Sequence, residues 1–258
     1  MQDQARSKRV NNFIKQKRFY MLEVQSVSKN FGALQVLDGL SLQVQDGEAL
    51  GIIGPNGAGK STLFNLIAGE FGASRGKIIY QGKDLGSLSA QNRCHLGIGR
   101  SYQIPRPFAK MTVFENLLVA NSFGGGSRDR ANTDQCVHIL EKTDLLKYAN
   151  NLSNSLTLLQ RKKLELARAL ATNPKLLLLD EIAGGLTEGE CHSLIQVIES
   201  IRKDGISIIW IEHIFHALSA VVDKVLAINF GQFLAYGTPK EVIESAQVQE
   251  VYMGIEVE

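Results

Sequence analysis

The 258-residue sequence is poor in cysteine, proline and tryptophan, and it has no long apolar run. Its three cysteines, Cys94, Cys136 and Cys191, are odd in number and widely spaced. The sequence therefore predicts neither a disulfide framework nor a structural zinc site. No segment approaches the roughly 18 apolar residues that a membrane-spanning helix needs, and no signal-peptide core follows the first methionine. We expect a cytoplasmic protein with reduced thiols.

An excess of charge of one sign is also lacking. The 28 lysines and arginines nearly balance the 26 acidic residues, which leaves a formal net charge of +2. This charge is too small for the concentrated basic face of a nucleic-acid-binding protein, so no nucleic-acid partner is predicted. Six basic residues do gather in residues 1–20, namely Arg6, Lys8, Arg9, Lys15, Lys17 and Arg18. We expect a disordered basic tail there, with an anionic lipid surface as the alternative partner, and a folded domain over residues 21–258.

The order of apolar patterns indicates the fold class. Hydrophobic residues make up 44% of the chain and charged residues 21%, as in globular proteins. Apolar alternation and unbroken apolar runs predict strands at residues 21–24, 40–44, 49–53, 77–80, 176–179, 207–211 and 224–230. Apolar residues at helical spacing predict helices at residues 62–68, 113–119, 131–147, 164–171 and 191–202, with a glycine-rich break at 122–127. The alternation of strands and helices predicts an α/β fold with a doubly wound parallel core.

A phosphate-binding loop is the most specific motif. The stretch from Gly54 to Ser61 fits the pattern G-x-x-x-x-G-K-[ST] at each fixed position. It follows an apolar strand and opens a helix, so its backbone N–H groups face phosphate oxygens. Lys60 is predicted to reach the β- and γ-phosphates, Ser61 to coordinate magnesium, and Thr62 to add a phosphate contact. The predicted nucleotide-binding residues of this motif are Gly54, Pro55, Asn56, Gly57, Ala58, Gly59, Lys60, Ser61 and Thr62.

Two carboxylates end the apolar run at residues 176–179. Asp180 and Glu181 fall at the C-terminal edge of the predicted sheet, where α/β proteins bind their ligands. Asp180 is predicted to hold magnesium. Glu181 is predicted to orient and polarise the attacking water, because phosphoryl transfer depends on an in-line nucleophile and on charge neutralisation. An Asp-Glu pair after an apolar run is a weak signal of a catalytic site by itself. Together with the phosphate loop it becomes a strong one.

With these two motifs in place, the chain resembles the ATP-binding subunits of ABC transporters from about Leu22 to Gly254. The resemblance implies a P-loop NTPase core of ABC type with an antiparallel β part. It also implies a helical subdomain at about residues 105–172 within an ABC ATP-binding domain over 21–258. The implied activity is ATP hydrolysis coupled to transport, and the implied cofactors are ATP and Mg²⁺.

The resemblance assigns roles to further residues. Gln103 is similar to the glutamine that contacts magnesium and the water, and His213 to the switch histidine that contacts the γ-phosphate and Glu181. Phe31 matches the aromatic that stacks on adenine, and Thr157 keeps the hydroxyl of the family signature. The implied catalytic residues are Lys60, Gln103, Glu181 and His213. The implied metal-site residues are Ser61, Gln103 and Asp180.

Two segments depart from the family pattern. The signature, usually Leu-Ser-Gly-Gly-Gln, has Leu158 and Leu159 in place of both glycines. Glycines there would let backbone N–H groups approach the γ-phosphate on the opposite subunit. Residues 183–187 replace the family's D-loop, and Thr187 stands where many relatives have an aspartate. These departures favour, as an alternative, a nucleotide-gated module with little hydrolysis.

Within the family, the chain is similar to the branched-chain amino acid uptake group at residues 100–108, 124–126 and 251–254. Importers of urea and amides and a lipopolysaccharide-export ATPase look similar, so the solute and the direction of transport stay open. The implied partners are transmembrane permease subunits, a second copy or a related ATP-binding subunit, and indirectly a solute-binding protein. The protein would lie peripherally on the inner face of the cell membrane. A non-transport ATP switch is a further alternative, but the single phosphate loop and the lack of heptads disfavour it.

Overall fold

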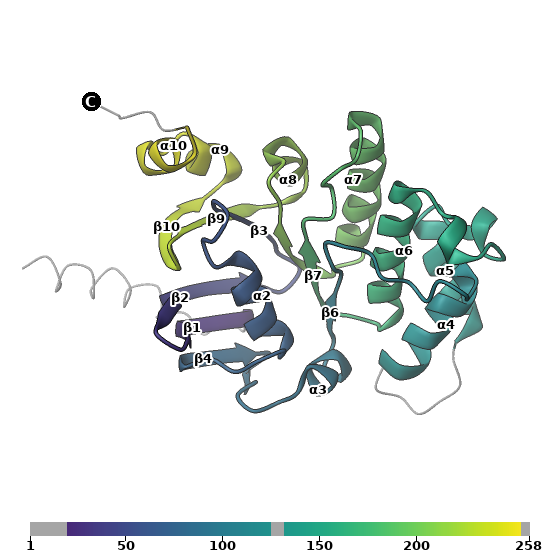
Figure 1. The fold of residues 1–258 in the computed structure, drawn as a ribbon, viewed down its shortest axis with the longest axis horizontal. Coiled ribbons are helices and arrows are strands. Elements are labelled where there is room, and N and C mark those ends of the chain that lie inside the picture. The colour runs from purple at the N-terminus through teal and green to yellow at the C-terminus, as the bar shows by residue number, and fades with distance from the viewer. Residues whose placement is uncertain (1–19, 125–131, 254–258) are drawn as a thin grey trace, which may run out of the picture.

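The computed structural model describes residues 20–124 and 132–253, and Figure 1 shows their path. The basic tail predicted for residues 1–20 therefore lies outside the described residues, except for Tyr20. The same holds for most of the glycine-rich break at 122–127 and for Gly254. Within the described ranges, no helix is long and apolar enough to cross a bilayer.

A small antiparallel sheet forms the first part of the fold. Its strands are β1 (Tyr20–Phe31), β2 (Leu34–Gln45), β4 (Arg75–Tyr80) and β5 (Lys83–Asp84), in the order β2-β1-β4-β5. Leu22 on β1 pairs with Val44 on one side and with Tyr80 on the other. All three side chains are buried, so the alternation seen in the sequence marks the face that packs on the core.

A second sheet carries the C-terminal edge at which the predicted site residues lie. Its strand order is β10-β9-β3-β8-β7-β6, and all strands but β10 run parallel to their neighbours. The strands are β3 (Ala49–Ile53), β6 (Ile98–Arg100), β7 (Leu176–Asp180), β8 (Ser207–Ile211), β9 (Lys224–Asn229) and β10 (Gln232–Gly237). Every residue of β3, β7 and β8 is buried, which explains why these strands are continuous apolar runs in the sequence.

The helices cover the sheets in two groups. Helices α4 (Val113–Gly124), α5 (Thr133–Lys142) and α6 (Leu158–Ala171) pack together at one end, beside α7 (Glu188–Lys203) (Figure 1). The remaining helices are α2 (Lys60–Ala68), α3 (Ala90–His95), α8 (Phe215–Val221), α9 (Pro239–Ile243) and α10 (Ala246–Met253). Two short 3₁₀ turns, η1 (Leu146–Tyr148) and η2 (Ser153–Ser155), connect α5 to α6.

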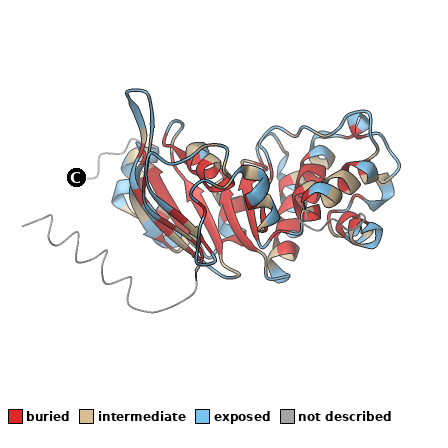
Figure 2. Ribbon diagram, turned by 90° about the horizontal axis from the view of Figure 1, so that it is seen from below, coloured by how far each residue is buried: buried red, intermediate tan, exposed pale blue. Residues whose placement is uncertain are grey.

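Two apolar clusters hold these layers together, and Figure 2 shows buried residues concentrated along the strands between them. One cluster joins the antiparallel sheet and α2 to one face of the parallel sheet, and it includes Leu22, Phe64 and Ile211. The other joins the opposite face to helices α4 to α8, and it includes Leu166 and Trp210. The fold thus confirms the expected α/β core with an antiparallel β part and a set of helices at one end.

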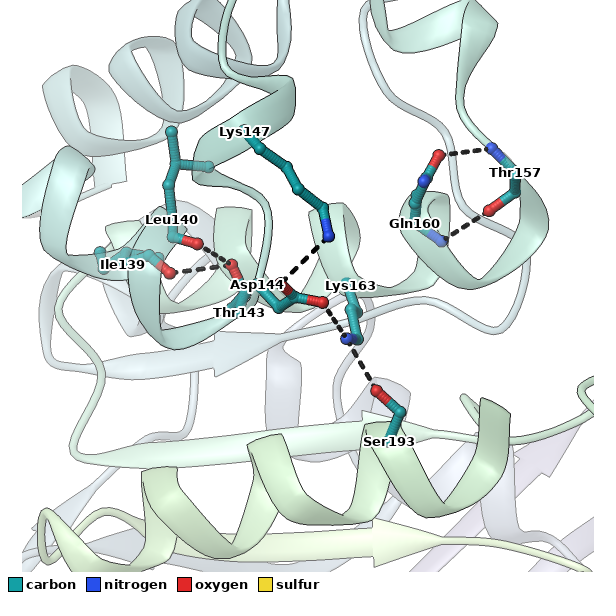
Figure 3. Close-up of polar contacts among 9 residues, drawn as sticks. All are labelled: Ile139, Leu140, Thr143, Asp144, Lys147, Thr157, Gln160, Lys163 and Ser193. Carbon is teal, nitrogen blue, oxygen red and sulfur yellow. Dashed lines mark hydrogen bonds and ion pairs between the residues drawn. The ribbon is translucent and has the colours of Figure 1, made fainter. Parts of the chain in front are cut away.

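Several predicted boundaries were wrong. The helix predicted at residues 131–147 ends at Lys142, because Asp144 has a positive φ of 55° and a 3₁₀ turn follows. Asp144 bonds to Lys163 of α6 and so fixes this break against the next helix (Figure 3). The strand predicted at 224–230 ends at Asn229, since Phe230 (φ 45°) and the next residue form a turn into β10. The apolar patterns also did not predict seven elements, namely β5, α3, β6, α8, β10, α9 and α10.

Candidate active site

The loop between β3 and α2 has the backbone of a phosphate cradle. Gly57 and Gly59 have positive φ angles of 82° and 98°, which favour glycine. A Cβ atom on Gly59 would lie 2.9 Å from the carbonyl oxygen of Val36 on β2. Gly59 also stands at the N-cap of α2 without a side-chain cap, so the first N–H groups of the helix are directed toward the loop. Residues 54–61 therefore join the end of β3 to the start of α2, and their binding of phosphate stays a prediction.

Lys60 places its ammonium group inside this loop. Its Nζ donates to the carbonyl oxygens of Gly54 and Pro55, at 2.6 and 3.0 Å. Burial lowers the pKa of Lys60, and the nearby carboxylates of Glu181 and Asp180 oppose that shift. The cation thus already lies at the point where the loop is predicted to hold the nucleotide phosphates.

The other predicted loop residues differ in exposure. Asn56 and Gly57 are exposed, Ala58 is buried, and Ser61 and Thr62 follow Lys60 on the first turn of α2. The carbonyl oxygen of Ala58 accepts a bond from Gly231 N in the turn between β9 and β10. The turn between β9 and β10 is therefore bonded to the phosphate loop. The sequence patterns did not indicate this contact.

Asp180 ends β7 with a carboxylate that is 9% exposed. Burial raises the pKa of Asp180, and the ion pair with Arg100 at 3.1 Å opposes the shift. Arg100 contacts Oδ2 of this carboxylate. Lys60 and Glu181 are close enough to influence the same group electrostatically. The structure therefore brings the predicted metal ligand, the loop lysine and the predicted catalytic carboxylate to one edge of the sheet.

Glu181 lies between two predicted partners. Gln103 Nε2 donates to Oε2 of Glu181 at 2.6 Å, and His213 Nε2 lies 2.8 Å from Oε1. The backbone of Glu181 has a φ of 46°, a region that costs a non-glycine residue free energy and that recurs at functional sites. Its N–H donates to the carbonyl oxygen of Ile211 at the end of β8, which holds the unusual conformation. Gln103, Glu181 and His213 thus converge from three separate segments.

Glu212 supports this arrangement although sequence reasoning gave it no role. Its Oε2 accepts the N–H of Ala183 at 3.0 Å, and its Oε1 accepts the N–H of His213 at 3.1 Å. Burial raises the pKa of Glu212. Burial lowers the pKa of Lys162 on α6, and the nearby carboxylates of Glu212 and Glu181 oppose that shift. Glu212 therefore joins the segment after Glu181 to the segment that carries His213.

The segment aligned with the family signature opens α6. Thr157 is the N-cap residue, its hydroxyl accepts from Gln160 N, and Gln160 Oε1 accepts from Thr157 N (Figure 3). Leu158 is 42% exposed, whereas Leu159 packs partly buried against the core. A Cβ on Gly185 would lie 3.5 Å from Leu158 Cδ2. The two departures from the family pattern, in the signature and in residues 183–187, therefore lie close together at Leu158 and Gly185.

Phe31 and Thr157 are the two predicted nucleotide contacts outside the phosphate loop. Phe31 ends β1, is 47% exposed, and contacts the Phe71 ring edge to face with centroids 5.3 Å apart. The ammonium of Lys29 lies 5.0 Å from the Phe31 centroid. Stacking of Phe31 on adenine stays a prediction. The contact of Thr157 with a nucleotide stays one as well.

The residues at the sheet edge fit a magnesium ion that also binds phosphate. Mg²⁺ prefers hard oxygen ligands and usually keeps only one or two protein ligands beside phosphate and water. Asp180, which Lys60 influences electrostatically, and the exposed residue Ser61, which follows Lys60, have such oxygens. Within the described part of the chain, no group of three or more His, Cys, Asp or Glu side chains could hold a metal alone. The donor set therefore suits a metal that arrives with a nucleotide.

The comparisons with known proteins agree with this geometry. The ABC transporter family pattern matches residues 37–184. BraF of Pseudomonas aeruginosa, a high-affinity branched-chain amino acid transport ATP-binding protein, is 32% identical over 249 residues, which cover 91% of this chain and 98% of BraF. LivG of Salmonella typhimurium is 34% identical with the same coverage. LptB of Haemophilus influenzae, a lipopolysaccharide export ATP-binding protein, is 30% identical over 91% of this chain and 97% of its own length.

Solved structures give the same result. A nucleotide-free ATP-binding cassette from an ABC transporter superposes with a TM-score of 0.84 at 31% identity, covering 92% of this chain and 100% of its own. The ADP conformation of MJ1267, another ATP-binding cassette, gives 0.83 at 31% identity, with coverage of 92% and 99%. The chain belongs to the ABC transporter family. It is the ATP-binding, ATP-hydrolysing subunit of a transporter of that family.

Proposed function

We propose that this subunit powers the import of branched-chain amino acids or of a similar small solute. The similarity to BraF and LivG over 91% of the chain supports this solute class. The observation that carries the motor function is the Glu181 carboxylate, held by Gln103 and His213 beside Lys60 and Asp180. LptB, at 30% identity, serves export, so lipopolysaccharide is the competing cargo.

The roles of the site residues follow from their positions. The backbone of residues 54–59, Lys60 and Thr62 bind the phosphates, because N–H groups and a buried cation converge there. Ser61, Asp180 and Gln103 hold Mg²⁺, which neutralises phosphate charge when it is bound. Glu181 orients the attacking water, and His213 holds Glu181 and reaches toward the γ-phosphate.

The wider assembly is part of the same proposal. Phe31 stacks on adenine, and Thr157 contacts the nucleotide held by a second ATP-binding subunit, either a second copy or a related chain. Residues 21–258 act as one ABC domain in which about 105–172 form a helical subdomain. The mutual packing of α4, α5 and α6 supports this division.

The membrane partners are transmembrane permease subunits, and a solute-binding protein acts through them. The protein lies peripherally on the inner face of the cell membrane. The segment from Gln103 to Phe114 transmits the nucleotide state to the permeases, because Gln103 bonds to Glu181 at one end of it. Ile104, Phe108 and Met111 in the same segment expose apolar surface, which supports a protein partner.

Magnesium-dependent phosphate release tests the motor function. Wild type, Lys60→Ala, Glu181→Gln and the exposed control Lys240→Ala are compared, alone and with co-purified membrane subunits. We expect turnover in wild type and control, loss of ATP binding in Lys60→Ala, and binding without turnover in Glu181→Gln. If wild type binds ATP but no sample hydrolyses it, even with membrane partners, a nucleotide-gated module replaces the motor.

Reconstitution in proteoliposomes tests the solute. ATP hydrolysis by the intact transporter is measured with a binding protein loaded with leucine, isoleucine or valine, and separately with lipopolysaccharide. Stimulation by the amino acids supports the proposal, and stimulation by lipopolysaccharide contradicts it. Co-purification with ribosomes or DNA in place of permeases would instead indicate a non-transport ATP switch.

A further inference from the structure

Arg100 connects two elements of the site that are far apart in sequence. It is the last residue of β6, and its Nη1 donates to Asn65 Oδ1 on α2 at 2.6 Å. Its Nη2 donates to Oδ2 of Asp180 at 3.1 Å. One planar guanidinium thus joins the helix of the phosphate loop to the end of β7, with donors in a fixed relative geometry.

This ion pair lies inside the protein. The Arg100 and Asp180 side chains are only 11% and 9% exposed. Buried ion pairs recover their desolvation cost only when their geometry is good, and a hydrophobic replacement is often as stable. The Nε atom of Arg100 is buried without a hydrogen-bond partner among the described residues. A gain in stability alone therefore explains this pair poorly. The bonds of Arg100 to α2 and to the end of β7 indicate that it positions Asp180.

A stacking contact fixes the guanidinium further. Its central carbon lies 4.9 Å from the centroid of the Tyr102 ring, and Tyr102 Oη donates to Glu70 Oε1 at 3.4 Å. Glu70 follows α2, so the contacts of Arg100 and Tyr102 reach both Asn65 and the segment beyond the helix. Gln103, which bonds to Glu181, comes directly after Tyr102. The segment from Arg100 to Gln103 therefore contacts Asp180 at its start and Glu181 at its end.

We propose that Arg100 is a positioning residue for magnesium, which holds Oδ2 of Asp180 so that Oδ1 is presented to the ion bound with ATP. Through Asn65 it keeps Asp180 in register with the phosphate loop, and through Tyr102 and Gln103 it links the metal ligand to Glu181. This inference rests on the proposed role of Asp180 as a metal ligand.

The test measures nucleotide and metal binding by the full-length chain, without using turnover. N-methylanthraniloyl-ATP fluorescence gives the affinity in EDTA and the Mg²⁺ concentration for half-maximal binding. In Arg100→Met we expect this Mg²⁺ concentration to rise about 10-fold, the lower end for loss of a group that orients a metal ligand. The affinity in EDTA should stay near that of wild type. The matched control is Arg168→Met, which removes an arginine paired with buried Glu165 at 2.9 Å.

Two further variants separate positioning from charge. Arg100→Lys keeps the charge but cannot bond Asn65 and Asp180 through a rigid fork, and Asn65→Ala removes only the anchor on α2. Both should give intermediate Mg²⁺ requirements, and Asn65→Ala should add nothing in the Arg100→Met background. These two variants decide the question if circular dichroism shows that Arg100→Met fails to fold.

Asp180→Asn separates the metal role of Asp180 from the positioning role of Arg100. If it leaves the Mg²⁺ requirement unchanged, the proposed metal role of Asp180 fails. If it raises the requirement while Arg100→Met and Arg100→Lys match wild type, only the role of Arg100 fails. A lower Mg²⁺ requirement in Arg100→Met, or an equal loss of affinity in EDTA, would also overturn the proposal.

Discussion

His213 Nε2 lies 2.8 Å from Oε1 of Glu181, although 32 positions separate the two residues in sequence. Glu212 bonds to both segments, because its two carboxylate oxygens accept the N–H groups of Ala183 and His213. The segments that carry the histidine and the glutamate are therefore joined through their backbones by one carboxylate. Preorganised polar groups of this kind stabilise charge that develops during a reaction.

Removal of the His213 imidazole should lower turnover and leave nucleotide binding intact. We expect His213→Ala to reduce phosphate release about 100-fold, the scale of a lost general acid–base partner. The ATP affinity should stay near that of wild type, because the phosphate loop is unchanged. His216→Ala, an exposed histidine on α8, is the matched control. A His213→Ala protein with wild-type turnover would show that Glu181 needs no support from this side chain.

The sequence indicated the positions of several site residues better than the contacts that connect them. Lys60, Asp180 and Glu181 each follow a short apolar strand in a local motif, so their place at the sheet edge could be read from spacing. The Arg100–Asp180 pair spans 80 positions, and no periodicity marks it. The break after Lys142 depends on a positive φ at Asp144, which a helical apolar pattern does not reveal. Contacts of this kind belong to tertiary structure and could not be predicted from spacing.

Gly231 should be among the most sensitive glycines. Its φ is 73°, and an added Cβ would lie 2.2 Å from the carbonyl oxygen of Val36 and 2.8 Å from Leu37 Cα. Its N–H also holds Ala58 in the phosphate loop. We expect Gly231→Ala to lower the free energy of unfolding by about 3 kcal/mol or more and to weaken ATP binding.

Gly205 provides the control for backbone strain alone. Its φ is 84°, but an added Cβ would meet nothing within 4 Å. Gly205→Ala should therefore cost only about 1 kcal/mol, the lower end for an alanine in the left-handed region. Urea unfolding measures both variants. Equal losses would show that the contact with β2 relaxes and that only the backbone angle matters.

Glu165 should make stability fall as the pH rises. Burial raises its pKa above the usual value of 4.5, and the pair with Arg168 opposes the shift only in part. A carboxyl with a raised pKa in the folded state contributes stability that is fully present below its unfolded pKa. That contribution is lost as the pH rises through the folded pKa. Glutamine does not titrate, so Glu165→Gln should show a smaller fall in unfolding free energy between about pH 5 and 7.

The comparison of slopes isolates Glu165 from the other buried carboxyl groups. Asp180, Glu48 and Glu212 also have raised pKa values, but they titrate equally in both proteins. Urea unfolding at a series of pH values gives both slopes. Identical slopes would mean that Glu165 is ionised in the folded protein over the whole range.

The two leucines of the signature segment should limit closure of the ATP-bound dimer. Leu158 is exposed and lies close to Gly185, and Leu159 is partly buried against the core. The Leu158→Gly, Leu159→Gly double variant exposes backbone N–H groups there, so we expect tighter ATP-dependent dimers and faster turnover. It should also lose about 1–2 kcal/mol of stability, because glycine disfavours the helix. Size-exclusion chromatography with ATP in the Glu181→Gln background measures dimer formation.

Leu146→Gly, an exposed leucine in η1, controls for the loss of an apolar surface side chain. If the double variant forms no tighter dimer than this control, the leucines do not restrict approach to the nucleotide. The proximity of Leu158 to Gly185 would then reflect only packing within one subunit. If the ATP-bound dimer becomes tighter and turnover rises together, the side chains at 158 and 159 limit the rate of hydrolysis. The contacts of Glu181 with Gln103 and His213 are present with both leucines in place.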